Sequence, residues 1–135
     1  MIANVLLVAL GGFLGAMARY RLTYALTKNF SGTFPHATLF VNGLGSFILG
    51  VMLGLQVSTT LNVLLAIGFL GSFTTFSTIN AELVRFKNEK NWVFFTNYVV
   101  LTYLFGIVIA FAGFMTSSLM LQLQMHLQLI SFMLK

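Results

Sequence analysis

The sequence predicts an all-α membrane protein with four transmembrane helices per chain. Of its 135 residues, 59% are hydrophobic and only 7% are charged, and the mean hydropathy is +0.97. So few charged side chains cannot cover the surface of a water-soluble domain of this size. The uncharged stretches fall into four runs long enough to cross a bilayer. The chain has no cysteine, which excludes disulfides and thiolate metal sites.

Each predicted span is an uncharged run bounded by polar or charged residues. With a rise of about 1.5 Å per residue and a hydrocarbon core about 30 Å thick, roughly 20 residues cross a membrane. The predicted spans are residues 2–18, 37–57, 61–81 and 92–114, which together form one predicted four-span domain over residues 1–114. Only three residues separate the second run from the third, so we expect these two helices to form a hairpin. The first run lacks the positive flank of a signal peptide, and we interpret it as a span.

Residues 115–135 form a tail whose placement stays open at this stage. From residue 121 to residue 128 apolar and polar side chains alternate, with a period closer to two than to 3.6. One interpretation is that the tail extends the fourth helix beyond the membrane and lies at the interface. His126 has no second His, Cys or carboxylate near it in the sequence, so we interpret it as a solvated side chain rather than a metal ligand.

The third span contains a run of small and polar residues that a lipid-facing helix does not normally carry. Residues 68–79 read GFLGSFTTFSTI. Two structures fit this run. In one, the helix is broken near the membrane midplane, and its freed carbonyl and N–H groups coordinate ions. In the other, the helix is intact and its hydroxyl groups bond neighbouring helices.

Other polar residues within the spans predict an interior suited to a small anion. Arg19 ends the first span, Asn42 lies in the second, and Tyr98 and Thr102 share one face of the fourth. Hydroxyl, amide and guanidinium groups donate hydrogen bonds or carry positive charge. The span interiors hold no carboxylate, and Glu82 comes only at the end of the third.

These features also exclude several functional classes. No metal-ligand cluster, nucleophile with a base or carboxylate pair can be assembled, so we do not expect an enzyme. The net charge of +5 lies in short connections, which is typical of membrane topology rather than nucleic-acid binding. Two alternatives stay open. A small four-span cation exporter would need an acidic residue in its path, with Glu82 as the only candidate, and a non-conducting membrane assembly protein would use its hydroxyls only to join helices.

Three motifs resemble the Fluc (CrcB) fluoride channel family. They are GGFLGAMARY at residues 11–20, TLFVNGLGSFILG at residues 38–50 and GFLGSFTTFSTI at residues 68–79. The resemblance covers roughly residues 2–114 and leaves the tail outside. It implies a passive fluoride channel of the bacterial plasma membrane, built as an antiparallel homodimer with two pores, that lets cytoplasmic fluoride leak out. It also implies a break in the third helix.

The resemblance assigns roles to individual residues. Those that match the family's fluoride path are Asn42 as a pore amide, Phe76 as an aromatic ring facing the ion, Ser77 and Thr78 as hydroxyls beside it, Tyr98 and Thr102 as a polar track, and Arg19 near the entrance. The backbone carbonyls of Gly71 and Thr74 match the family's central sodium site, so Na⁺ is the implied structural ion.

The sequence departs from the family pattern at Ile79. The family reads TTFSTF, with a second Phe where this chain has Ile79. An isoleucine has no ring quadrupole and no polarised C–H edge, so an ion site that uses the second ring is weakened. We therefore expect impaired fluoride conduction relative to an Ile79→Phe variant.

The distribution of positive charge conflicts with an antiparallel dimer, which requires the same chain to insert in both orientations. The side shared by the first and third connections holds Arg19, Arg21, Lys28, Arg85, Lys87 and Lys90, against only Lys135 on the other side. This imbalance favours a single orientation. The motifs are more specific than the charge count, and we keep the antiparallel dimer as the prediction.

Overall fold

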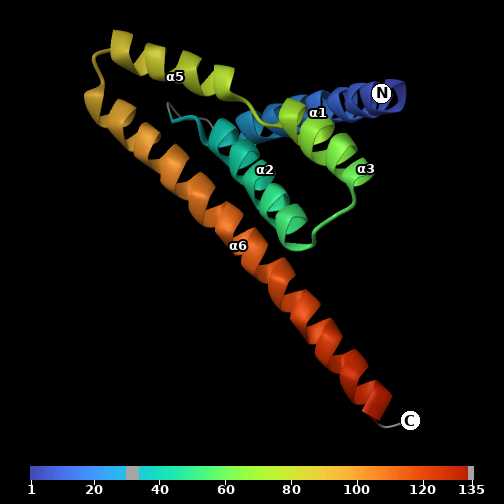
Figure 1. Cartoon of the computed structure of the whole chain (residues 1–135). Helices are drawn as coiled ribbons and strands as arrows, with labels where there is room; N and C mark the ends of the chain where they lie inside the picture. Colours follow the sequence, from blue (N-terminus) through green and yellow to red (C-terminus); the bar gives the residue numbers. More distant parts are fainter. Residues whose placement is uncertain (30–33, 134–135) are drawn as a thin grey trace.

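The computed structural model is all-helical and describes residues 1–29 and 34–133 (Figure 1). Four helical stretches are long and apolar enough to cross a membrane: Ile2–Lys28, His36–Gly54, Thr59–Asn88 and Trp92–Met133. The prediction of an all-α chain with four such helices is confirmed. The number of subunits and the position of the membrane relative to these helices stay predictions.

Helix α1 (Ile2–Asn29) is longer than the first predicted span. The apolar run ends at Ala18, but the helix continues through Arg19 and Arg21. Arginine, leucine and alanine all favour helical backbone, so a charged residue that ends a hydrophobic run does not end the helix. Arg19 is half-buried as a result, because it lies within a packed helix rather than in a connection.

Helix α2 (His36–Gly54) begins directly after Pro35, where proline's fixed φ suits a helix start. It ends at Gly54, three residues before the predicted end of the second span. A short turn follows in which Gln56 has a positive φ of 48°, and Asn62 Nδ2 donates a hydrogen bond to the Val57 carbonyl at 3.1 Å. This turn connects α2 to the third stretch.

The third stretch is divided into several segments, and it contains the predicted break. It starts with α3 (Thr59–Leu61), continues as the π-helix η1 (Asn62–Leu70) and ends its first half with α4 (Gly71–Phe73). Thr74 and Thr75 are extended, with ψ values of 158° and 119°. The chain then enters α5 (Phe76–Asn88). The broken helix is therefore the structure that this run adopts.

Helix α6 (Trp92–Met133) is one continuous helix of 42 residues that includes the described part of the tail. The interpretation of residues 121–128 as having a period near two does not describe the backbone, which is helical there. Leucine, methionine and glutamine are all good helix formers, so alternating polarity without a neighbouring strand does not produce a strand.

Glycines allow two pairs of segments to pack with their backbones in contact. A Cβ atom at Gly11 or Gly15 of α1 would overlap the backbone of η1, and one at Gly50 of α2 would overlap the backbone of Ala110 on α6. Helix α1 accordingly packs mainly along η1, and α2 packs along α6. Small residues at these positions thus allow the helix backbones to approach closely.

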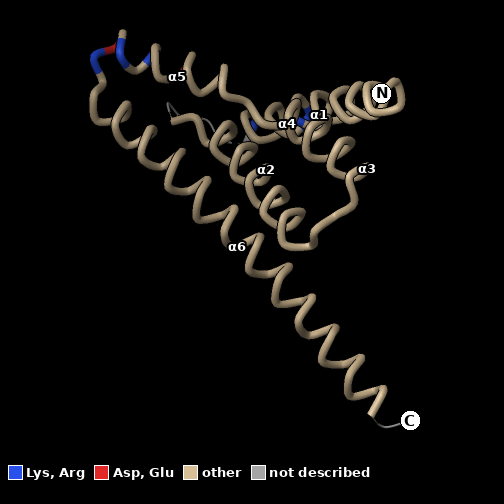
Figure 2. Tube along the Cα trace, in the orientation of Figure 1, with Lys and Arg blue, Asp and Glu red and all other residues tan. Residues whose placement is uncertain are grey.

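The charged residues are concentrated on two parts of the chain. In Figure 2 they lie on α1 and around the connection between α5 and α6, whereas α6 itself shows none. Lys135, the single positive charge predicted for the other side, lies outside the described residues. All of the described positive charges thus lie on the segments that the sequence assigns to one side.

Candidate functional site

The candidate site is built around the break between α4 and α5, which Asn42 of α2 holds in place. The Thr75 N–H donates to Asn42 Oδ1 at 2.8 Å, and Asn42 Nδ2 donates to the Thr75 carbonyl at 3.1 Å. The amide thus satisfies both backbone groups of Thr75, which have left the helical ladder. One N–H of Asn42 stays available after these two bonds are made.

Thr75 also starts the next helix. Its Oγ1 accepts a hydrogen bond from the Thr78 N–H at 3.2 Å, which is the arrangement of a helix N-cap. The same oxygen lies 2.9 Å from Thr78 Oγ1 and 3.2 Å from Ser77 Oγ. The hydroxyls predicted from the TTFST run are therefore brought together at the first turn of α5. Sequence reasoning missed the cap at Thr75, although a Thr directly before a helical segment is a usable N-cap signal.

The break leaves several backbone carbonyls without helical donors, among them those of Gly71 and Thr74. In an uninterrupted helix the Gly71 carbonyl would accept from the Thr75 N–H, and the Thr74 carbonyl from the Thr78 N–H. Both donors are diverted, to Asn42 and to the Thr75 side chain. These are the two carbonyls that the motif comparison predicts as sodium ligands.

Arg19 contacts one of these carbonyls. Its Nη1 donates to the Thr74 carbonyl at 3.2 Å, which joins α1 to the break. A carbonyl oxygen has two lone pairs, so one acceptor position remains on Thr74. Arg19 also lines a cavity of about 260 Å³ together with Thr38, Thr75 and Thr78. The guanidinium is thus part of the site itself.

Glu82 is the main residue that sequence reasoning left out of the site. Thr38 Oγ1 donates to its Oε1 at 2.7 Å, and the Tyr98 hydroxyl donates to its Oε2 at 2.5 Å. Tyr98 is fully buried and Thr38 is 5% exposed, so the carboxylate joins α2, α5 and α6 in a half-buried position. The available signal for this contact was that two buried hydroxyl groups need hydrogen-bond partners.

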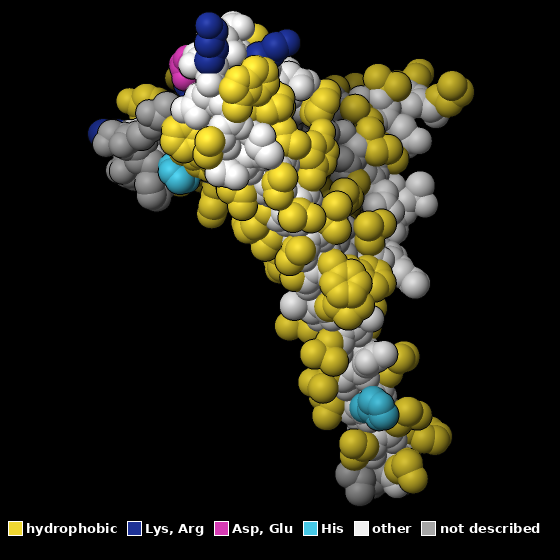
Figure 3. All heavy atoms as spheres, turned by 90° about the vertical axis from the view of Figure 1, so that its left-hand side faces the viewer, with side chains coloured by type: hydrophobic (Ala, Val, Ile, Leu, Met, Phe, Trp, Pro, Cys, Tyr) yellow, Lys and Arg dark blue, Asp and Glu magenta, His cyan; other side chains and the backbone are white. Residues whose placement is uncertain are grey.

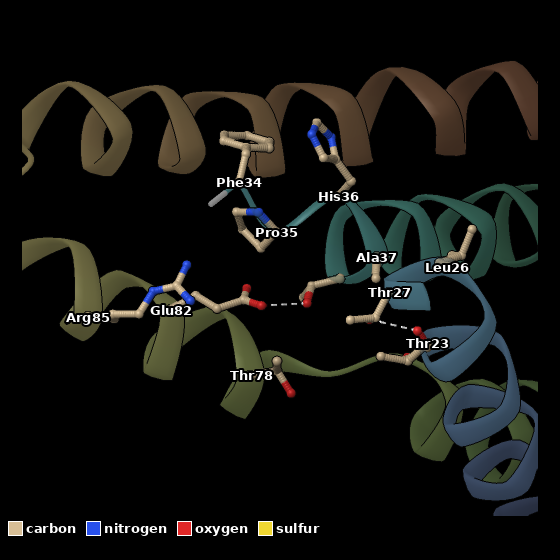
Figure 4. Close-up of a pocket in the computed structure, with 11 residues that line it drawn as sticks. Thr23, Leu26, Thr27, Phe34, Pro35, His36, Ala37, Thr78, Glu82 and Arg85 are labelled. Carbon is tan, nitrogen blue, oxygen red and sulfur yellow. Dashed lines mark hydrogen bonds between the residues drawn. The ribbon is translucent and has the colours of Figure 1, made fainter. Parts of the chain in front are cut away.

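A second cavity, of about 220 Å³, lies beside Glu82 between the end of α1, the segment before α2 and α5. Figure 4 shows Glu82 and Thr78 entering from α5 and Thr23 from α1, with Arg85 at its edge. This cavity shares Thr23, Thr38 and Thr78 with the cavity around Arg19. Polar groups therefore line both spaces from the charged end of the molecule to the break.

Thr102 lies on the other side of Asn42. Both residues line a cavity of about 240 Å³ with Ser46 and Gly106. Thr102 Oγ1 is buried and has no hydrogen-bond partner among the described residues. An unpaired buried hydroxyl is unfavourable unless water or an ion occupies the space beside it. This orphaned hydroxyl extends the row of polar groups along α6.

Phe76 and Ile79 lie on different faces of α5. Phe76 is 67% exposed, whereas Ile79 is 8% exposed and packs in a core cluster with Phe86 and Tyr98. The structure therefore places Arg19 and Thr78 around one cavity and Asn42 and Thr102 around another. It leaves the Phe76 ring on the surface of the single chain.

Comparison with known proteins gives the family. Residues 6–114 match the family model described as CrcB-like protein, Camphor Resistance (CrcB). The chain belongs to the CrcB family. This confirms the prediction made from the three motifs, and the match ends where the predicted channel domain ends, so the tail lies outside it.

Bacterial members of the CrcB family are close relatives along most of this chain. The chain is 45% identical over 110 residues to "Fluoride-specific ion channel FluC 2" of Bacillus thuringiensis subsp. konkukian. The aligned residues make up 82% of this chain and 93% of that protein. It is 40% identical over 115 residues to "Fluoride-specific ion channel FluC 1" of Listeria innocua serovar 6a, covering 85% of this chain and 98% of the relative. These relatives are named as channels rather than enzymes, and with the four apolar helices they identify a multi-pass membrane protein.

Proposed function

We propose that this chain is a passive, fluoride-selective channel that exports cytoplasmic fluoride and works as an antiparallel homodimer with two pores. Relatives of 40–45% identity carry the name of fluoride-specific channels. The observation that carries the proposal is the broken third helix, whose fixed geometry places the Asn42 amide beside two cavities, one lined with Thr102 and the other with Gly71 and Thr74.

Neutral hydrogen-bond donors suit the passage of fluoride. The ion is compact and strongly hydrated, so it enters a protein only where several donors replace its lost water. A fixed positive charge in direct contact would hold it too long, whereas conduction requires each site to release the ion. Thr78, Asn42 and Thr102 supply such modest donors in sequence, and Arg19 raises the local anion concentration while its guanidinium stays bonded to Thr74.

The hydrogen bonds to Glu82 determine which hydroxyl groups near the charged end of the molecule are free to donate to an ion. Thr38 and Tyr98 both direct their hydroxyl hydrogens to the carboxylate. For Tyr98 to donate to a passing ion, its hydroxyl must leave Glu82. In this proposal the carboxylate keeps the polar track satisfied while no ion is present.

A structural Na⁺ fits the carbonyls of Gly71 and Thr74. Carbonyl oxygens are hard donors suited to such a cation, and both have lost their helical N–H partners. Gly71 and Thr74 line a cavity of about 340 Å³ with Asn42 and Ser46. When bound, the ion would supply positive charge at the break. Arg19 already donates to the Thr74 carbonyl, so this oxygen would share its two lone pairs between the guanidinium and the ion.

The dimer part of the proposal rests on exposed groups beside the site. Phe76 is exposed directly after the break, and a second copy would cover its ring and close the cavity that holds Gly71 and Thr74. The positive charges favour one orientation, so labelling is the direct test. Single cysteines at both ends of the Cys-free chain should react from both sides of intact cells, and one-sided labelling would contradict an antiparallel dimer.

The conduction proposal is tested by removing one hydroxyl. Thr102→Val keeps the side-chain shape and deletes the buried, unpaired oxygen, so we expect fluoride efflux from liposomes to fall about tenfold or more, which is about 1.4 kcal/mol in the barrier. Thr96→Val, at an exposed position of the same helix, is the matched control and should leave efflux unchanged. Equal efflux from both variants and the unmodified chain would remove Thr102 from the path.

Two other functions make different predictions. A cation exporter that uses Glu82 would stop working in Glu82→Gln and would show proton-coupled cation flux. A non-conducting assembly protein would show no ion flux in any variant. The family match and the named relatives favour the channel.

A further inference from the structure

Helix α6 is too long for one membrane crossing. It contains 42 residues, which at about 1.5 Å per residue extend roughly 63 Å, about twice the thickness of the hydrocarbon core. Even at a tilt of about 40°, the largest usually seen, the core accommodates only about 26 residues. The family match ends at residue 114, so about one half of this helix belongs to the pore domain and the rest is a feature of this chain.

The surface of the tail helix is apolar and uncharged. No Asp, Glu, Lys or Arg occurs from residue 92 to residue 133. Its large exposed side chains are Leu119, Met120, Leu123, Met125, Leu127, Leu129, Ile130, Phe132 and Met133. In Figure 3 hydrophobic side chains follow this helix away from the body of the molecule, interrupted by one histidine. A helix of this composition is not stable as a free projection into water.

The apolar surface of the tail continues the lipid-facing surface of the span. Exposed apolar residues follow one another at three- and four-residue intervals along α6 at positions 104, 108, 111, 115, 119 and 123. The first of these lie within the predicted fourth span. This apolar surface continues past residue 114 without interruption. We therefore expect lipid to cover the tail as it covers the span.

Between the span and the tail α6 is continuous, but hydroxyl side chains share its backbone carbonyls. Thr116 Oγ1 donates to the Gly113 carbonyl at 2.8 Å, and Ser117 Oγ donates to the carbonyls of Gly113 at 3.0 Å and Phe114 at 2.9 Å. Side-chain donors that share helical carbonyls weaken the ladder and bend helices. Ser117 also packs against Gly54 at the end of α2, and beyond it α6 leaves the other helices (Figure 1).

We propose that residues 119–133 lie along the membrane surface as an interfacial helix, after a bend at residues 113–118. The side that carries Leu119, Leu123, Leu127 and Ile130 enters the acyl chains, and the stripe that carries Gln124 and Gln128 lies among the headgroups. His126 lies at the edge of the apolar side, next to Leu119, and its imidazole extends from there to the headgroups. The proposed partner is a lipid surface. This inference is independent of conduction, because it rests on a segment outside the pore domain.

Depth measurements along the tail test the proposal. The chain has no cysteine, so single cysteines carrying nitroxide labels report one position at a time in liposomes. Labels at positions 119, 123, 127 and 130 should lie at similar depth, shielded from a water-soluble nickel chelate and accessible to oxygen. Labels at positions 124 and 128 should be more accessible to nickel. Ile107 within the span and Lys87 outside it give the two reference depths.

Two results would overturn the surface helix. A depth that decreases steadily with residue number, until position 130 is as accessible to nickel as position 87, would mean that the tail projects into water. Shielding of all six labels from both reagents, with spin–spin broadening that disappears on dilution with unlabelled protein, would mean that tails from several copies pack together.

Paired substitutions provide a second test. Leu123→Glu with Leu127→Glu should move a label at Ile130 from the acyl chains into water. Gln124→Glu with Gln128→Glu adds the same charge to the headgroup side and should leave that label in place. An unchanged depth at position 107 confirms that the span is intact. The same displacement by both pairs, or by neither, would contradict the proposed orientation.

Discussion

Removing the amide of Asn42 should destabilise the break more than any other single truncation in the site. In Asn42→Ala the Thr75 N–H loses its acceptor at 2.8 Å and the Thr75 carbonyl loses its donor at 3.1 Å. Thr75 is only 8% exposed, so water has little access to either group. No other side chain bonds both backbone groups of Thr75 among the described residues.

The size of the effect follows from these two bonds. Interhelical hydrogen bonds in membranes average about 0.6 kcal/mol each, which sets a lower value of about 1 kcal/mol for the pair. A buried polar group left unpaired costs about 1–3 kcal/mol, which gives about 2–6 kcal/mol for the two groups. Because Thr75 is buried, we expect the free energy of unfolding to fall by at least about 2 kcal/mol.

Reversible unfolding in detergent measures this difference. Asn97→Ala, at an exposed position of α6, is the matched control and should change the free energy of unfolding by less than about 0.5 kcal/mol. Asn42→Ala should also reduce fluoride efflux, because the geometry of the break is lost. Equal stability of the two alanine variants would refute the conclusion that the amide holds the break.

The remaining predictions concern three separate contacts. Tyr98→Phe should lower the free energy of unfolding by about 1.5–3 kcal/mol, the range for hydrogen bonds to charged groups. A double-mutant cycle with Glu82→Gln should show coupling between the two residues, and additive losses would contradict the bond at 2.5 Å. Gly50→Ala should prevent close packing of α2 on α6, seen as loss of the folded peak in gel filtration. In Gly12→Ala the new methyl group meets a side-chain oxygen at 3.2 Å and a backbone oxygen at 3.9 Å, and this variant should fold normally. Ile79→Phe should increase fluoride efflux from liposomes, and equal rates would show that a second ring is not needed.

The fold was predictable because it depends on local composition. Long uncharged runs predict membrane helices whatever they pack against, and the Ser- and Thr-rich third run predicted a break among its alternatives. The helix ends were not predictable in the same way. Arg19 ends an apolar run but not α1, and residue 114 ends the predicted span but not α6. Hydropathy reports the preferred solvent of a segment, whereas the end of a helix depends on backbone propensity and capping.

The site was only partly predictable because several of its contacts join distant parts of the chain. The motifs named Asn42, but its two bonds to Thr75 connect residues 33 positions apart. Glu82 was assigned to the end of a span, and its contact with Thr38 spans 44 positions. The contact of Arg19 with Thr74 spans 55. A single sequence carries no direct signal for such pairs, whereas the N-cap at Thr75 is local and was available from the pattern.

The central claim, that neutral donors around a broken helix conduct fluoride selectively, is tested most directly by anion efflux from liposomes that contain the purified, unmodified chain. With equal gradients of fluoride and chloride, the account predicts rapid fluoride release on an ion-selective electrode and chloride release no faster than from protein-free liposomes. Equal release of both anions, or no fluoride release from folded and reconstituted protein, would contradict it.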